Sequence, residues 1–334
     1  MKAAVYDGED FSVREISDPD LDDNEILIRV EACGICGTDI HVVEGDFPSS
    51  PPVVLGHEFS GEVEEVGCDV EEVDVGSTVT VNPNLYCGKC SYCREGKPNH
   101  CKNWEAIGLH RNGGFEEYVA VPESQVLEFN GLDYNVAAFA EPVSCAVRGI
   151  QRLDPELGDS VLVMGGGPIG LILSQLLSIS GAGEIILSEP VESKRRLAGE
   201  LGVDEVIDPT VEDPRESVME LTEDGVDSVV EATGIPEVSK KCLEVVKKEG
   251  DVLQFGVNPQ DSRISISPFK VYREEISLLG SFTNPFTTQK AVKLIESESI
   301  ELKPLVTSEV DLKDIEIGMD KFGDKDEIKI MVRP

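Results

Sequence analysis

The stretch SVLVMGGGPIG, residues 160–170, decides the fold of this chain. Its first five residues form an apolar run of the length of a buried strand, and the glycines with Pro168 predict a tight turn that opens a helix. Glycines between a strand and a helix let a pyrophosphate approach the backbone N–H groups at the positive end of the helix. The stretch therefore predicts a dinucleotide-binding turn made of Gly165, Gly167, Pro168, Ile169 and Gly170.

A parallel sheet is expected around this stretch, over residues 146–285. Short apolar segments alternate there with helical stretches, which is typical of strands buried between two layers of helices. Six strands are predicted, enough for a complete doubly wound sheet, at residues 161–164, 184–187, 205–207, 228–230, 252–255 and 276–279. Residues 160–183 contain no charge and are long enough to cross a bilayer, but their glycines and serines favour a strand, a turn and a helix.

The segments before and after this region have a different pattern of expected strands and helices. Residues 1–145 are expected to form a mostly β domain of short strands between turns, at residues 2–6, 25–32, 59–66, 78–81 and 115–121. Residues 286–334 should form a helix, a strand, a second helix near 312–322 and a last strand at 328–332. This tail is too short to fold alone, so we expect it to return to the first domain.

Acidic residues dominate the composition of the 334-residue chain. With 29 Lys and Arg against 65 Asp and Glu, its formal net charge is −36, and the acids are spread through apolar periodic segments. The charge therefore belongs to folded surfaces. It argues against binding to nucleic acid, where phosphate contact needs cations, and against anionic membranes. The N-terminus has no apolar signal-peptide core, so we expect a cytoplasmic protein.

Four of the nine cysteines lie in one short loop, Cys87, Cys90, Cys93 and Cys101. Four thiolates at this spacing can close a tetrahedron around Zn²⁺ and leave no open position, which defines a structural zinc site. Two disulfides or free thiols are the alternative, but disulfides are disfavoured inside cells. A nucleic-acid-binding zinc module is also disfavoured, because the loop has few basic residues.

A second group of possible metal donors lies in CGICGTDIH, residues 33–41, and in GHE, residues 56–58. Cys36 and His57 are the thiolate and imidazole donors that zinc prefers, and a catalytic zinc keeps one position open for water or substrate. Alone, Cys36 would be a buried thiol about as often as a ligand, and His57 would more often be an ordinary polar residue. The prediction of a zinc site rests on their combination.

Glu189 ends the second predicted strand of the sheet, after IILS at residues 185–188. A carboxylate at this place can accept hydrogen bonds from both ribose hydroxyls and repels a 2′-phosphate, which favours NAD over NADP. The alternative is that Glu189 is one more surface acid, because the nearby Lys194, Arg195 and Arg196 could serve a phosphate.

Taken together and in this order, GICGTD at 34–39, GHE at 56–58, the four-cysteine loop and GGGPIG at 165–170 resemble the zinc-dependent medium-chain dehydrogenases and reductases. The resemblance covers essentially the whole chain. It is closest to the polyol, threonine and butanediol dehydrogenases, because Ala140-Glu141-Pro142 stands where classical alcohol dehydrogenases have a cysteine ligand. It implies a GroES-like catalytic domain over residues 1–145, a Rossmann NAD-binding domain over 146–285, the return of 286–334 to the catalytic domain, and a homodimer or homotetramer.

The resemblance also implies which residues bind the catalytic zinc. Cys36, His57 and Glu141 would be ligands, and Glu58 would be a fourth ligand or a neighbour that exchanges with one. Asp39 would orient His57 from behind. Together with the four-cysteine site, this gives two zinc ions per chain.

Further roles follow from the same resemblance. Thr38 would hydrogen-bond the substrate oxygen, and His41 would pass its proton toward solvent. Thr233, Gly256 and Val257 would line the cofactor. Zinc would lower the pKa of the alcohol, a relay would remove its proton, and the hydride would go to the nicotinamide.

The expected activity is therefore the oxidation of a small secondary alcohol, a polyol or a sugar, with NAD. A threonine or amino-alcohol dehydrogenase, or a simple alcohol dehydrogenase, is the alternative enzyme. A retired family member with a structural role is the alternative that is no enzyme. It would be marked by lost ligands or a spoiled glycine turn, and the sequence shows neither.

High salt should stabilise this protein, as expected for a salt-rich cytoplasm. The net charge of −36 repels itself in dilute buffer, whereas molar salt shortens the Debye length to ~3 Å. We expect the melting temperature to rise between dilute buffer and molar KCl. An unchanged melting temperature would contradict the salt-adapted interpretation.

Overall fold

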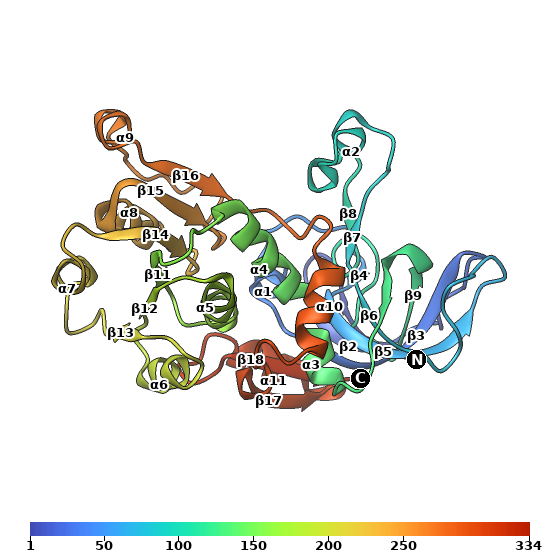
Figure 1. The fold of residues 1–334 in the computed structure, drawn as a ribbon. Coiled ribbons are helices and arrows are strands. Elements are labelled where there is room, and N and C mark those ends of the chain that lie inside the picture. Colours follow the sequence, from blue (N-terminus) through green and yellow to red (C-terminus); the bar gives the residue numbers. More distant parts are fainter. The chain divides into compact units, whose positions relative to one another are not determined.

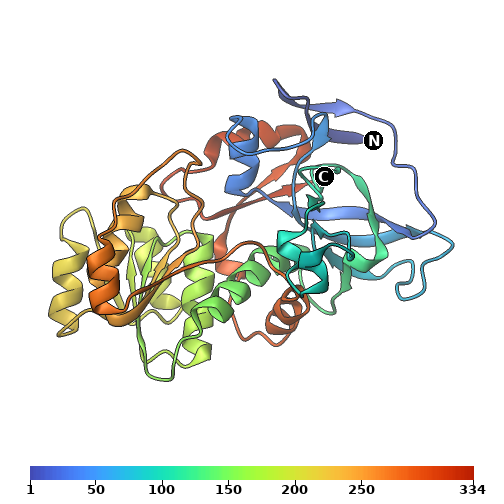
Figure 2. The same ribbon diagram turned by 90° about the horizontal axis from the view of Figure 1, so that it is seen from above.

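The computed structural model describes residues 1–334, and the chain divides into two compact units. Unit 1 consists of Met1–Ser144 and Thr283–Pro334, and unit 2 of Cys145–Phe282. Both ends of the chain therefore lie in unit 1, where C-terminal strands, in red, lie beside N-terminal ones, in blue (Figure 2).

Unit 2 is built on a six-stranded sheet in the order β13-β12-β11-β14-β15-β16, and every pairing in it is parallel. The strands are β11 (Ser160–Met164), β12 (Glu184–Ser188), β13 (Glu205–Ile207), β14 (Val226–Glu231), β15 (Val246–Gln254) and β16 (Ser277–Gly280). The order reverses between β11 and β14, and in such sheets ligands bind beyond the carboxyl ends of the strands at this point. The predicted doubly wound parallel sheet is confirmed.

Helices cover both faces of this sheet, with α5 and α6 on one side and α7 and α8 on the other (Figure 1). The helices are α4 (Ala140–Leu153), which begins in unit 1, α5 (Pro168–Ser180), α6 (Glu192–Glu200), α7 (Pro214–Leu221), α8 (Pro236–Val245) and α9 (Pro268–Glu274). The uncharged residues 160–183 form β11, the glycine turn and α5, most of which is buried. No helix in the structure has the length and apolar character needed to span a membrane.

Unit 1 contains a seven-stranded sheet, a three-stranded sheet β2-β1-β4 and the pair β7-β8. The seven-stranded sheet has the order β10-β6-β5-β3-β18-β17, and β9 also pairs with β3. The strands are β1 (Lys2–Tyr6), β2 (Phe11–Glu15), β3 (Glu25–Gly34), β4 (Val53–Val54), β5 (Glu58–Val66), β6 (Thr78–Val81), β7 (Asn84–Leu85), β8 (Glu105–Ala106), β9 (Tyr118–Pro122), β10 (Val126–Glu128), β17 (Val306–Asp311) and β18 (Lys329–Arg333).

The helices of unit 1 are short and lie between these strands. They are α1 (Gly37–Val43), α2 (Ser91–Arg94), α3 (Tyr134–Ala138), α10 (Thr288–Glu296) and α11 (Ile315–Lys321), with 3₁₀ turns at Pro98–His100, Glu123–Gln125, Lys303–Leu305 and Leu312–Asp314. The helix expected near 312–322 therefore begins as a 3₁₀ turn and becomes α-helical at Ile315.

One expected strand is divided between two sheets. The segment 115–121 was predicted as a single strand, but Ala4 N–H donates to the Phe115 carbonyl at 2.8 Å and Glu117 N–H to the Lys2 carbonyl at 3.2 Å. These bonds tie its first residues to β1, while Val30 N–H donates to the Glu117 carbonyl at 3.0 Å and the paired residues of β3 begin with Arg29 opposite Tyr118. The strand therefore starts at Tyr118, because the chain changes partner there.

Three neighbouring strands of unit 1 bring distant parts of the chain together. β3 pairs antiparallel with β5, with Gly34 opposite Glu58, and on its other side β3 pairs with β18, with Gly34 opposite Met331. A Cβ atom on Gly34 would lie 2.5 Å from Glu58 Oε2 and 3.3 Å from Lys329 Cδ. A side chain at Gly34 would therefore have to displace the Glu58 carboxylate, at the place where the side chains of two other strands meet.

Candidate active site

Three possible zinc ligands come together in unit 1. The ligand atoms of Cys36, His57 and Glu58 all lie within 4.8 Å of one another. Cys36 is the residue before α1, two positions after the end of β3, while His57 and Glu58 lie at the start of β5. The antiparallel pairing of β3 with β5 thus joins two motifs that are about twenty residues apart in the sequence. A thiolate, an imidazole and a carboxylate form a donor set that suits zinc.

Asp39 contacts the segments that contain Cys36 and His57. The fully buried carboxylate accepts hydrogen bonds from Cys36 N–H at 2.9 Å and from Gly56 N–H at 3.3 Å, and its Oδ1 lies 3.5 Å from His57 Nδ1. Burial alone would lower the pKa of His57, but the negative charges of Cys36 and Asp39 raise it well above its ordinary value. The surroundings of this imidazole therefore favour a positive charge, which a proton or a metal ion can supply.

The other predicted residues of this site are placed as follows. Thr38 Oγ1 lies 3.7 Å from Cys36 Sγ, and His41, on the same helix α1, is 43% exposed. Glu141 is buried in the first turn of α4, and its carboxylate is not among the donor atoms that lie within 4.8 Å of one another. The structure thus brings Thr38 next to the donors but does not place Glu141 in the same close group.

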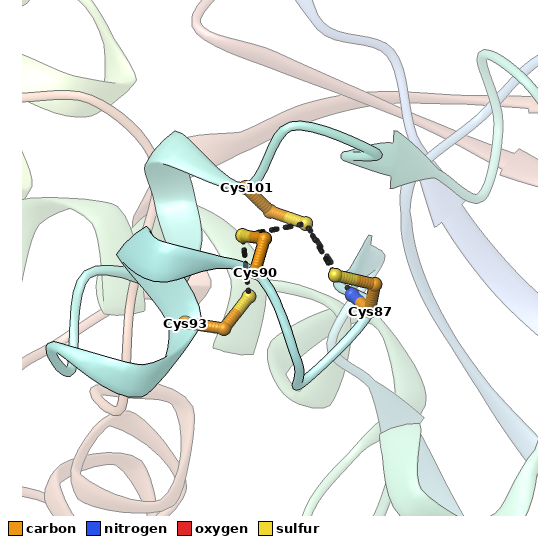
Figure 3. A group of neighbouring side chains, drawn as sticks. All are labelled: Cys87, Cys90, Cys93 and Cys101. Carbon is orange, nitrogen blue, oxygen red and sulfur yellow. Dashed lines mark hydrogen bonds between the residues drawn. The ribbon is translucent and has the colours of Figure 1, made fainter.

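The four-cysteine loop forms a second donor group in unit 1 (Figure 3). The Sγ atoms converge, with 3.5 Å between Cys90 and Cys93, 4.0 Å between Cys90 and Cys101, and 3.5 Å between Cys101 and Cys87. Backbone N–H groups of Cys93 and Lys102 lower the pKa of Cys90 to about 6, whereas burial raises that of Cys93 to about 12. All four thiols are free, and four sulfur donors fit a structural zinc ion.

The glycine turn after β11 in unit 2 has the close contacts that dinucleotide binding requires. Gly165 has a φ of 107°, and a Cβ there would lie 2.8 Å from Thr233 Cγ2. A Cβ on Gly170 would lie 1.9 Å from the Gly165 carbonyl oxygen, so only glycine lets α5 start this close to the turn. Pro168 occupies the first turn of α5, where its missing N–H costs nothing.

Glu189 lies against this turn. Its carboxylate accepts hydrogen bonds from Gly166 N–H at 2.7 Å and from Val191 N–H at 2.9 Å. Of the nearby cations, Arg195 pairs with Asp208 at 2.8 Å and donates to the Glu189 carbonyl at 2.7 Å. Arg195 is therefore already paired with Asp208, and Glu189 is the charged group next to the glycine turn.

Glu231 was not singled out from the sequence. It is fully buried at the end of β14 and accepts hydrogen bonds from Thr233 N–H at 2.8 Å, Gly234 N–H at 3.1 Å and Gln254 Nε2 at 2.6 Å. A Cβ on Gly256 would lie 2.6 Å from its Oε2. The carboxylate thus joins the loops that contain Thr233 and Gly256. The available signal was an acid directly after the apolar Val229 and Val230.

Comparison with known proteins decides the family. Residues 22–131 match the alcohol dehydrogenase GroES-like domain, and residues 168–297 match the zinc-binding dehydrogenase domain. The chain is 35% identical over 339 residues to D-arabinitol dehydrogenase 1 of Uromyces fabae, covering 100% of this chain and 97% of that protein. It belongs to the zinc-binding dehydrogenases.

Two further comparisons describe the range of this zinc-binding dehydrogenase's relatives. It is 34% identical over 322 residues to L-threonine 3-dehydrogenase of Pyrococcus abyssi, covering 94% of this chain and 90% of that one. A Sinorhizobium meliloti 1021 protein described as a zinc-binding dehydrogenase, solved bound to NADP, has a TM-score of 0.97 and 39% identity, covering 100% of this chain and 99% of that one. The family and the oxidoreductase class expected from the motifs are confirmed.

Lys329 is a residue of this zinc-binding dehydrogenase that the sequence reasoning missed. It begins β18, is buried, and its Nζ contacts Glu58 Oε2 at 2.5 Å and the Ile35 carbonyl at 3.1 Å. Burial would lower the pKa of Lys329, but Glu58 and Cys36 raise it above its ordinary value. The ammonium is thus the counter-charge of Glu58. The available signal was a single lysine in the apolar strand IKIMV, residues 328–332.

Removing this counter-charge should destabilise the zinc-binding dehydrogenase strongly. Lys329→Met leaves Glu58 charged and buried, which should lower the free energy of unfolding by about 3–5 kcal/mol. Adding Glu58→Gln should recover most of this loss, because neither charge then remains. Urea denaturation of the single and double variants measures both effects.

The matched control is Lys313→Met. Lys313 pairs with Asp311 at 2.9 Å on the surface, where such pairs contribute at most about 1 kcal/mol. If Lys329→Met costs no more than Lys313→Met, the buried pair does not have the role assigned to it.

Proposed function

We propose that this zinc-binding dehydrogenase oxidises a secondary hydroxyl group of a polyol or a sugar and passes the hydride to NAD. The supporting observation is the group of Cys36, His57 and Glu58, which offers one thiolate where a simple alcohol dehydrogenase would offer two. The identity of 35% with a D-arabinitol dehydrogenase supports the polyol class. L-threonine is the second candidate substrate, on the strength of the Pyrococcus relative.

Cys36, His57 and Glu141 hold the catalytic zinc in this proposal, with Glu58 as a fourth ligand or an exchanging neighbour. Glu58 is held by Lys329, so its carboxylate is shared between the ammonium and any metal. Lys329 Nζ lies 5.9 Å from the centre of the Phe139 ring, and Phe139 is the residue before α4. This contact brings the segment that contains Glu141 near the donor group. A second carboxylate is a harder donor than a second thiolate and suits a substrate with two neighbouring oxygens.

The chain's own groups can then move the substrate proton. When bound, zinc polarises the substrate oxygen and NAD accepts the hydride. The Thr38 hydroxyl lies beside Cys36 and can accept the proton of the substrate hydroxyl while it passes its own proton on toward solvent. His41 follows on α1 and is partly exposed, so it can release that proton to water. Asp39 keeps His57 and the backbone of Cys36 in place throughout.

The four-cysteine loop holds a structural zinc ion in this proposal, because four sulfurs leave no position for a substrate. The same free thiols suit a reducing cytoplasm. The intact donor groups and glycine turn do not support a retired family member. The net charge of −36 supports the proposal that the protein is adapted to a salt-rich cytoplasm.

Losing Glu141 should remove the catalytic zinc and turnover together. Glu141→Ala takes away one of three strong ligands, so we expect one zinc ion per chain instead of two, and polyol oxidation should fall at least about a hundredfold. NADH binding and the four-cysteine zinc should persist. Elemental zinc analysis and a panel of polyols, sugars, threonine and short alcohols measure these outcomes. Two zinc ions per chain with near-normal polyol oxidation would remove Glu141 from the ligand set.

NAD is the preferred cofactor in this proposal, because Glu189 lies next to the glycine turn and Arg195 is occupied by Asp208. The Sinorhizobium structure binds NADP, so relatives of this fold accept the phosphorylated cofactor as well. The choice therefore depends on the charged side chains around Glu189 rather than on the fold.

Replacing Glu189 should weaken NAD binding and relax the discrimination against NADP. Glu189→Ala should raise the Michaelis constant for NAD about tenfold, since the ribose loses a charged acceptor. Glu189→Gln is the control, because it keeps an acceptor for Gly166 N–H but removes the charge that repels a 2′-phosphate. If the unaltered protein already prefers NADP several-fold, this assignment of Glu189 is wrong.

A homodimer or homotetramer is also part of the proposal. β16 pairs only with β15, so it is an edge strand of its sheet, and Leu278 on it is 52% exposed. Phe269 and Tyr272 on the preceding helix α9 are exposed as well. An edge strand with exposed apolar side chains can pair with the same strand of a second copy around a two-fold axis.

A charge on this edge should weaken the assembly. Leu278→Lys should shift the protein toward the monomer, because each copy would then have a charged side chain on the edge that pairs. Leu157→Lys is the control, since Leu157 is an exposed leucine of unit 2 outside the strand. Light scattering measures the mass of both variants. A Leu278→Lys protein that keeps the oligomeric mass would exclude this edge as the interface.

A further inference from the structure

A chain of buried hydrogen bonds runs through unit 1, outside both donor groups. Trp104 Nε1 donates to Asn84 Oδ1 at 2.9 Å, and Asn84 Nδ2 donates to Asn284 Oδ1 at 2.7 Å. Asn284 Nδ2 donates to Ser144 Oγ at 2.5 Å, and Ser144 Oγ donates to the Glu141 carbonyl at 2.6 Å. Asn84, Asn284 and Ser144 are all buried. Polar groups this deep are costly without partners, and the side-chain oxygen and nitrogen atoms of all three residues have one.

The chemical groups at the two ends of this series of hydrogen bonds allow donation in one direction only. An indole N–H can only donate and a carbonyl can only accept, so every group between Trp104 and Glu141 must accept from one neighbour and donate to the next. The orientation of both asparagine amides follows from this. Ser144 has one proton, and it is used on the Glu141 carbonyl. Asn284 therefore completes the arrangement by donating to Ser144 rather than accepting from it.

The two ends of this series of hydrogen bonds lie beside the four-cysteine loop and in the first turn of α4. Asn84 is on β7 and Trp104 precedes β8, the paired strands at the base of the four-cysteine loop. Glu141 is in the first turn of α4 and is a zinc ligand in the proposed function. The chain of bonds thus connects the start of α4 to the strand pair β7-β8, which is distant in the sequence.

The backbone around Asn284 is held in an unusual conformation. Thr283 has a φ of 52° and Phe286 a φ of 62°, in the left-handed region that residues other than glycine rarely adopt. Such conformations are unfavourable for residues other than glycine and persist only where the surroundings force them. Thr287 supplies part of that force, since its single hydroxyl proton is shared between the carbonyls of Ser144 and Asn284, which lie 2.8 Å and 2.9 Å from Oγ1. The amide of Asn284 is thereby aimed at Ser144.

We propose that Asn284 is a positioning residue that holds the first turn of α4, through Ser144, so that the Glu141 carboxylate is fixed for the catalytic zinc. This inference rests on the proposed role of Glu141. A group behind a metal ligand usually contributes about 10–100-fold in metal affinity, and Asn284 acts through one further residue. We therefore expect the lower end of this range.

The test compares Asn284→Ala, Ser144→Ala and Asn135→Ala in the full chain. Ser144→Ala removes the hydroxyl that accepts from Asn284 and donates to the Glu141 carbonyl, and it leaves the bond between Asn84 and Asn284 in place. Asn135 is the matched control, a buried asparagine of unit 1 that donates to Glu309 at 2.9 Å and takes no part in the chain of bonds. Zinc is counted by elemental analysis during competition with a chelator of known affinity, and NADH binding and thermal unfolding are recorded alongside.

Both Asn284→Ala and Ser144→Ala should weaken the binding of one of the two zinc ions about tenfold, while NADH binding and the four-cysteine zinc stay unchanged. Asn135→Ala should bind both ions normally, even if it melts earlier. If Asn284→Ala and Ser144→Ala lose only thermal stability, as Asn135→Ala does, the positioning role is wrong. Glu141→Ala is run in parallel. If it too keeps both zinc ions, the ligand assignment fails, and the positioning role fails with it.

Discussion

The buried pair of Lys329 and Glu58 holds together the part of unit 1 on which the metal donors depend. Glu58 begins β5 and Lys329 begins β18, and the two residues lie on either side of Gly34 at the end of β3. A carboxylate this deep would be very costly without a partner. The last strand of the chain must therefore return to the first unit, and by returning it sets the position of β3 and of Cys36 just beyond it.

Close approach of backbones plays the corresponding part in unit 2. Gly170 nearly touches the Gly165 carbonyl, and Gly165 packs against Thr233 from the neighbouring loop. Any side chain at either position would separate the turn, the helix and the loop. Glu189 and Glu231 lie next to these glycines, and the carboxylate of each accepts hydrogen bonds from backbone N–H groups. The edge around the glycine turn is thus a set of short backbone distances stabilised by two buried carboxylates.

The acids of this protein act differently at the surface and inside. On the surface they supply the net charge of −36, which salt can screen. Inside, Asp39, Glu58 and Glu231 are each matched by hydrogen-bond donors or an ammonium. Glu116 is the exception, because its Oε2 has no partner and burial raises its pKa to about 9, so that it stays neutral at pH 7. A chain with so many carboxylates therefore keeps inside only those that have a counter-charge, donors or a proton.

The sequence by itself determined the features that depend on neighbouring residues. The apolar run and glycines of residues 160–170 predicted the strand, turn and helix, and the alternation after them predicted the parallel sheet, because both patterns follow from local periodicity and sterics. The spacing of the four cysteines likewise brought them together in one short loop. Only the tertiary structure showed Lys329 beside Glu58, the division of residues 115–121 between two sheets, and the bonds from Trp104 through Asn284 to Glu141. The contact between Lys329 and Glu58 joins residues 271 positions apart, and which distant strands become neighbours is decided by the packing of the whole unit rather than by any local pattern.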